Sequence, residues 1–151
     1  MKIIFFGSAH FAEIILKALH TLKCGTLLAV ITTPDAKQGR GQHVASPPVK
    51  VYAQKMNLPC LQPPKLKDPD FLATLANFSA DIFFVVSYGK ILPREVLQIP
   101  KYYSINIHPS LLPKYRGPSP INYALLHGDS ETGFSVIKLN EKIDVGDLFY
   151  Q

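Results

Sequence analysis

The stretch Lys2-Ile3-Ile4-Phe5-Phe6-Gly7-Ser8-Ala9-His10-Phe11 decides the fold of this chain. Lys2 to Phe6 has the apolar character of a buried strand, and Gly7 marks a tight turn. After the turn, apolar residues recur at helical spacing, at Phe11, Ile14, Ile15, Ala18, Leu19 and Leu22. A buried strand followed at once by an amphipathic helix is the repeating unit of α/β proteins. The turn lacks the three glycines of a dinucleotide-binding fingerprint, which argues against a nicotinamide or flavin enzyme.

The same alternation of strands and helices continues along the chain. Apolar runs predict further strands at 26–32, 60–61, 81–86 and 103–107. Helical patterns predict helices at 47–56, 70–78, 93–97 and 120–126, the last capped by Ser119 with Pro120 in its first turn. Strands separated by helices pair in parallel through right-handed crossovers. We therefore expect an α/β, Rossmann-like fold: a mostly parallel twisted sheet with helices on both faces, and an antiparallel edge formed by 132–139 and 148–151.

Composition limits the classes of protein that the chain can represent. Its 151 residues, 47% hydrophobic and 18% charged, have the balance of one globular domain. Cys24 and Cys60 lie in unrelated settings, which argues against a zinc site or a disulfide framework. No apolar stretch is long enough for a signal peptide or a membrane span, so we expect a cytoplasmic protein. The spacing of the cysteines leads us to expect no bound metal. The net charge of +5 fits an anionic partner, and equally a solvated basic surface.

Three residues suggest acyl transfer. Asn106 lies in the predicted strand 103–107, which leads into His108, so the two side chains can share one face if the strand is regular there. Asp144 follows in Lys142-Ile143-Asp144-Val145-Gly146-Asp147. An amide can donate to an oxyanion, an imidazole can carry a proton near neutral pH, and a carboxylate can orient that imidazole or take a proton itself. The alternative is a hydrogen-bonded structural pair. The proline-rich loop 110–120 comes next, at a strand end where open α/β sheets bind ligands.

A second informative stretch is the polar segment 33–50, in which Gly39 and Gly41 flank Arg40. Glycines let the backbone approach a partner closely, and a basic loop suits phosphate. A solvated surface loop is the alternative that composition alone leaves open.

The chain resembles the folate-dependent formyltransferases over essentially its whole length. The resemblance rests on Asn106-Ile107-His108 with Ser110-Leu111-Leu112-Pro113 and Arg116-Gly117, on Ile143-Asp144-Val145-Gly146-Asp147, and on Ser87-Tyr88-Gly89-Lys90-Ile91-Leu92-Pro93. The loop from Pro34-Asp35 through Gly39-Arg40-Gly41 to Ser46-Pro47-Pro48-Val49-Lys50 resembles the branch that acts on methionyl-tRNA. The first turn departs from the family pattern, which more often has Gly-Thr-Pro-Asp-Phe.

The resemblance implies 10-formyltetrahydrofolate as the donor and the α-amino group of methionyl-initiator tRNA as the acceptor, in translation initiation. It implies that Asn106 and His108 bind the oxyanion and that Asp144 orients His108 and helps to remove the amine proton. The pterin would bind along main-chain groups of Ser87, Tyr88, Gly89, Lys90, Ile91 and Leu92. The tRNA would contact Lys37, Arg40, His43 and Lys50.

The resemblance also sets expectations about the rest of the molecule. Residues 1–151 would form the catalytic domain, incomplete at its carboxyl end and without the family's carboxyl-terminal β-barrel, and the protein would act as a monomer. Other acceptors stay open, since sugar-nucleotide and glycinamide ribonucleotide formyltransferases share the trio. A 10-formyltetrahydrofolate hydrolase would use it with water as the acceptor. In a non-catalytic nucleotide-binding module the trio would be structural.

Overall fold

The computed structural model describes residues 1–38 and 42–151. Its elements are β1 (Lys2–Gly7), α1 (His10–Leu22), β2 (Thr26–Ile31), β3 (Ala36–Gln38), β4 (His43–Ala45), α2 (Pro48–Lys55), β5 (Cys60–Leu61), α3 (Pro69–Asn77), β6 (Ile82–Val86), α4 (Arg94–Leu97), β7 (Tyr103–His108), α5 (Pro120–Leu126), β8 (Ser135–Lys138) and β9 (Leu148–Tyr150). None of the described helices is both long and apolar enough to cross a membrane.

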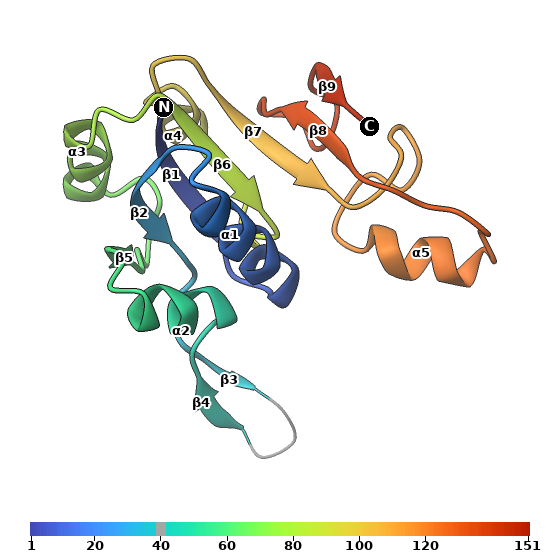
Figure 1. Ribbon diagram of the computed structural model, residues 1–151, viewed down its shortest axis with the longest axis horizontal. Helices are drawn as coiled ribbons and strands as arrows, with labels where there is room; N and C mark the ends of the chain where they lie inside the picture. The colour runs from blue at the N-terminus through green and yellow to red at the C-terminus, as the bar shows by residue number, and fades with distance from the viewer. Residues whose placement is uncertain (39–41) are drawn as a thin grey trace.

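The described residues form a seven-stranded sheet in the order β5-β2-β1-β6-β7-β8-β9 (Figure 1). The first five strands of this order run parallel, and β8 and β9 are antiparallel. The predicted parallel sheet with an antiparallel edge is therefore confirmed. Since parallel strands end at the same edge, the loops after β1, β2, β6 and β7 share one end of the sheet.

Helices cover both faces of the sheet, as predicted. Alternate side chains of a strand point to opposite faces, so Phe5 and Phe6 enter different cores. Phe5 packs in a cluster with residues of α1 and α2, among them Leu16 and Tyr52. Phe6 packs in a second cluster, which residues of α3 and α4 complete.

The predicted apolar stripe of α1 is confirmed in part, because Phe11, Ile15 and Leu19 pack against the core. Ala12 and Leu16 are fully buried, whereas Ile14, Ala18 and Leu22 are exposed. The turn explains the difference, because a Cβ at residue 7 would lie 2.7 Å from the Cβ of Ala12. The start of the helix thus presses against the end of β1, and this contact decides which side of α1 faces the sheet.

The predicted start of α5 is confirmed, with Ser119 at the N-cap and Pro120 in the first turn, although the Ser119 side chain makes no capping hydrogen bond. Two other local predictions were wrong. The segment after β2, predicted as an irregular loop, forms an antiparallel hairpin in which Lys37 pairs with Val44 and Gln38 with His43. Cross-strand pairing of short polar strands leaves little trace in composition, so the pattern did not reveal it. β8 is also shorter than predicted, covering only Ser135–Lys138.

Candidate active site

Asn106 and His108 lie near the carboxyl end of β7 and line one cavity. β7 is paired on both sides, with Asn106 opposite Val85 of β6 and Ile137 of β8. The cavity has a volume of about 680 Å³ and is also lined by the segments 87–92, 117–122 and 139–144. It therefore lies at the edge of the sheet where the parallel strands end, as expected for a ligand site in an open α/β sheet.

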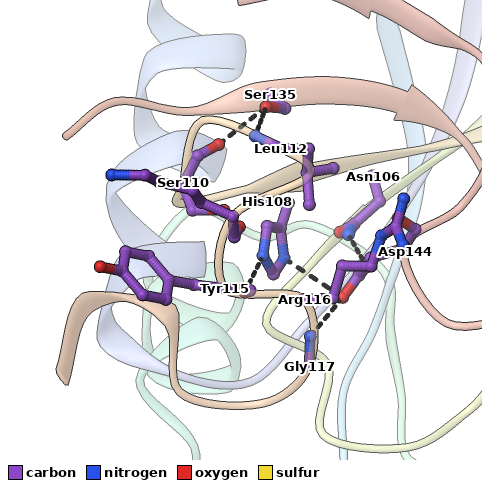
Figure 2. Close-up of polar contacts among 10 residues, drawn as sticks. Asn106, His108, Ser110, Leu112, Tyr115, Arg116, Gly117, Ser135 and Asp144 are labelled. Atoms are coloured by element: carbon purple, nitrogen blue, oxygen red, sulfur yellow. Dashed lines mark hydrogen bonds and ion pairs between the residues drawn. The ribbon is translucent and has the colours of Figure 1, made fainter. Parts of the chain in front are cut away.

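Asp144 reaches the same cavity from the loop between β8 and β9. Its Oδ2 lies 3.5 Å from Nδ1 of His108, and its Oδ1 lies 3.5 Å from Nδ2 of Asn106 (Figure 2). The backbone N–H of Gly117 donates to Oδ2 at 2.8 Å, and Nε of Arg116 donates to the main-chain carbonyl of Asp144 at 3.1 Å. The structure thus brings together the three residues predicted as catalytic, although they are separated by up to 38 positions in sequence.

The hydrogen bonds of His108 determine which ring nitrogen can act. Nε2 lies 2.9 Å from the main-chain carbonyl oxygen of Tyr115, and because a carbonyl only accepts, this hydrogen bond forms when Nε2 carries a proton. In the neutral ring, Nδ1 is then a bare acceptor that faces the Asp144 carboxylate. Nδ1 and Oδ2 can share one further proton, so the pair can act as a base toward a substrate.

Burial strengthens the electrostatics of this pair. The side chains of His108 and Asp144 are only 5% and 10% exposed. Charges with little water around them interact more strongly than charges at the surface. The Asn106 amide, which lines the same cavity, can direct an N–H toward an oxyanion formed there.

Two buried serines hold the loop that follows β7. Oγ of Ser135 donates to the carbonyl of Ser110 at 2.7 Å and accepts the N–H of Leu112 at 3.0 Å. Oγ of Ser110 donates to the carbonyl of Lys114 at 2.6 Å. These bonds hold the loop in place beside the cavity. Ser110 stands in a motif that the sequence highlighted, but Ser135 carried no signal in its own surroundings.

The segment 87–92, predicted to bind the pterin, lies along the cavity with all six residues among its lining. The ring of Tyr88 is buried in the core against Phe6, so its main chain is what remains to meet a ligand. Oγ of Ser8 donates to the Tyr88 carbonyl at 3.1 Å and accepts the N–H of Thr33 at 3.1 Å. Ser8 thus joins the first turn to this segment, a role that sequence reasoning missed.

Of the four residues predicted to contact tRNA, the three that the structure describes are absent from the cavity lining. Lys37 and His43 are exposed on the β3–β4 hairpin, which projects from the rest of the molecule (Figure 1). Lys50 differs in its surroundings, because its ammonium group donates to the Asp35 carboxylate at 2.7 and 2.9 Å, just before the first strand of the hairpin. Arg40 lies outside the described residues.

Across residues 1–38 and 42–151, no three His, Cys, Asp or Glu side chains gather in a way that could hold a metal ion. The groups that the cavity does present include the Asn106 amide, the His108 imidazole, the Asp144 carboxylate and the main chain. These groups suit acid–base and oxyanion-stabilised transfer.

Fold and site together define a Rossmann-like α/β domain with a cavity equipped for acyl transfer. A sequence model described as formyl transferase matches residues 1–151. The chain belongs to the formyl transferase family, which confirms the resemblance of its motifs.

Individual relatives agree with the family assignment. The chain is 46% identical over 152 residues to the methionyl-tRNA formyltransferase of Pelotomaculum thermopropionicum, with 100% of this chain and 48% of that protein covered. It is 43% identical to the methionyl-tRNA formyltransferase of Syntrophus aciditrophicus, with the same coverage. The chain thus spans about half the length of the curated relatives it matches.

A solved structure confirms the fold. The crystal structure of phosphoribosylglycinamide formyltransferase from Anaplasma phagocytophilum has a TM-score of 0.79 at 21% identity, covering 98% of this chain and 69% of that chain. At this level of identity the likeness concerns the arrangement of the elements alone.

Proposed function

We propose that this chain carries the formyl-transfer site of a methionyl-tRNA formyltransferase. The observation that supports this most directly is the identity of 43–46% to curated proteins of that name over the whole chain. In this proposal the donor is 10-formyltetrahydrofolate, the acceptor is the α-amino group of methionyl-initiator tRNA, and the protein acts in translation initiation as a cytoplasmic monomer.

The size and lining of the cavity support a folate as the donor in this proposal. Its volume of about 680 Å³ falls in the range typical of small-molecule sites. Ile91, Leu92 and Leu97 offer apolar surface to a flat heterocycle, while the main chain of 87–92 offers hydrogen-bonding groups to its edge. The formyl carbon would then lie within reach of Asn106 and the His108–Asp144 pair.

The proposed reaction is addition of the amine nitrogen to the formyl carbon, followed by loss of tetrahydrofolate. As the N–C bond forms, the carbonyl electrons move to oxygen, and the Asn106 amide donates to this oxyanion. The His108–Asp144 pair accepts the proton that leaves the amine. The family resemblance implied that His108 also binds the oxyanion, but its two ring nitrogens face the Tyr115 carbonyl and the Asp144 carboxylate, so this proposal leaves the oxyanion to Asn106. When the bond from carbon to N10 of the folate breaks, the oxyanion collapses, and N10 takes up a proton from that pair.

The acceptor would be held partly by the β3–β4 hairpin. The hairpin follows β2, whose carboxyl end lies at the same edge of the sheet as the ends of β6 and β7. Lys37 and His43 are exposed on it, and a lysine positioned this way can contact an RNA phosphate. Phosphate contacts of this kind position the RNA and leave the chemistry to the cavity.

The decisive experiment is transfer of labelled formyl from 10-formyltetrahydrofolate to methionyl-tRNA by the purified protein. Glycinamide ribonucleotide and an amino sugar nucleotide serve as competing acceptors, and formate release without any amine measures hydrolysis. Preferential labelling of the tRNA supports the proposal. Labelling of another acceptor, or formate release as the main product, would replace it with the corresponding alternative.

A further inference from the structure

His108 lies between two hydrogen-bond acceptors that compete for its proton. The main-chain carbonyl of Tyr115 lies 2.9 Å from Nε2, and a carboxylate oxygen of Asp144 lies 3.5 Å from Nδ1 (Figure 2). A neutral imidazole has only one N–H, so it can satisfy one of these acceptors. Whichever acceptor holds the proton decides which nitrogen remains able to act as a base.

The carboxylate would win this competition if both acceptors were equally placed. Hydrogen bonds to a charged acceptor are stronger than bonds to a neutral carbonyl. The proton would then sit on Nδ1, and the bare nitrogen would be Nε2, which faces Tyr115 rather than Asp144. The shorter distance to the Tyr115 carbonyl therefore has to compensate for the charge of the carboxylate, which makes the placement of this carbonyl important.

Tyr115 is held by its side chain in a backbone conformation that tyrosine seldom adopts. Its φ of 56° is in the left-handed region, which costs free energy for a residue with a Cβ. Its hydroxyl donates to Asp129 at 2.8 Å, and its ring stacks on Tyr123 with an interplanar angle of 11°. The hydroxyl bond also raises the pKa of Tyr115 and lowers the pKa of Asp129. Contacts on several sides thus hold the carbonyl toward His108.

We propose that Tyr115, anchored through its hydroxyl to Asp129, is a positioning residue that keeps the proton of neutral His108 on Nε2 and leaves Nδ1 as the base beside Asp144. This inference deepens the proposed function and rests on it for its catalytic meaning. In the reaction, the amine N–H bond breaks and an Nδ1–H bond forms, while the nitrogen electron pair makes the bond to the formyl carbon. The resulting imidazolium donates to both acceptors at once.

The test reads the tautomer directly, apart from activity. In ¹⁵N-histidine-labelled protein, imidazole ¹⁵N shifts and couplings distinguish a protonated ring nitrogen from a bare one. The variants are Tyr115→Phe and Asp129→Ala, which remove the anchor, and Asp129→Asn, which retains an acceptor for the hydroxyl. Tyr123→Phe is the matched control, because it removes a hydroxyl from the same ring cluster and leaves the bond to Asp129 in place.

We expect His108 of the unmodified protein to show protonated Nε2 and bare Nδ1 when neutral. Tyr115→Phe and Asp129→Ala should populate protonated Nδ1 and lower kcat roughly 5- to 10-fold, the scale of one hydrogen bond, with little change in KM. Asp129→Asn and Tyr123→Phe should resemble the unmodified protein. An unchanged tautomer in both anchor variants, or a His108 that stays doubly protonated wherever the protein is folded, overturns the proposal. The tautomer result stands even if formyl transfer fails.

Discussion

Tyr88 offers a quantitative test of the packing beside the cavity. Its side chain is 2% exposed, and its ring meets Phe6 edge-on with centroids 5.5 Å apart. Its buried hydroxyl finds no hydrogen-bond partner among the residues that the structure describes. Burial raises the pKa of this hydroxyl from 10 to about 12. The hydroxyl therefore carries a desolvation cost that Tyr88→Phe removes without altering the ring.

The effect has two parts of predictable size. At neutral pH, Tyr88→Phe should raise the free energy of unfolding by about 1 to 2 kcal/mol, because a buried group without a partner is lost. Because the pKa of Tyr88 is higher in the folded protein than in the unfolded chain, ionisation favours the unfolded chain. The unmodified protein therefore keeps its full stability below about pH 10 and loses stability as the pH rises toward 12. The advantage of the variant should therefore grow by up to about 1.4 kcal/mol per pH unit in that window.

Urea unfolding followed by far-ultraviolet circular dichroism measures both parts. Comparing the variant with the unmodified protein at each pH cancels the titration of the other groups. Tyr150→Phe is the matched control, since it removes the same hydroxyl group from a residue that is 62% exposed. A Tyr88→Phe protein that is less stable at neutral pH by 1 kcal/mol or more would show that the hydroxyl has a partner, and the reasoning would fail.

Four further predictions concern the site and its supports. Asn106→Ala should lower turnover by roughly 100-fold with the fold intact by circular dichroism, because one oxyanion donor is lost; near-normal turnover would remove Asn106 from the mechanism. Lys37→Ala should raise the KM for methionyl-tRNA, leave folate binding unchanged, and reduce the slope of log affinity against log salt by about one unit or slightly less. Bonds from Lys50 hold the pKa of Asp35 below 3.8, so the stability that this carboxylate contributes above that pH should be lost on further acidification, and Asp35→Asn should flatten this acid limb in urea titrations. Gly7→Ala should cost roughly 2 kcal/mol of unfolding free energy, because its Cβ would lie 2.6 Å from the Phe5 ring and 2.9 Å from the Val86 carbonyl; a thermal midpoint equal to the parent's would contradict this.

The order of strands and helices could be predicted from short sequence patterns. The strands at β1, β2, β6 and β7 are apolar runs bounded by turns, and the helices between them repeat apolar residues at helical spacing, so each can be recognised from neighbours in sequence. Parallel pairing then follows from the alternation alone, since right-handed crossovers leave few other arrangements. The predicted position of the site at the carboxyl ends of the strands has the same origin. Asn106 and His108 are close in sequence, so their shared face could also be predicted.

Tertiary contacts decided what sequence neighbours could not encode. Which side of α1 is buried depends on the approach of Gly7 to Ala12, a contact set by how the turn packs on the sheet. The pairing of Lys50 with Asp35 joins residues 15 positions apart, a contact that the local sequence pattern did not reveal.

The surroundings of His108, the candidate base, are the clearest example of a feature that depends on tertiary contacts. Asp144 comes 36 residues after His108, and only the folded chain places its carboxylate beside Nδ1. The group beside Nε2 is the main-chain carbonyl of Tyr115, which every residue type has and which residue type therefore cannot reveal. Residue types in the sequence determined which chemical groups the site contains. The tertiary structure determined which acceptor each ring nitrogen of His108 faces, because that depends on distances between atoms that sequence separation does not limit.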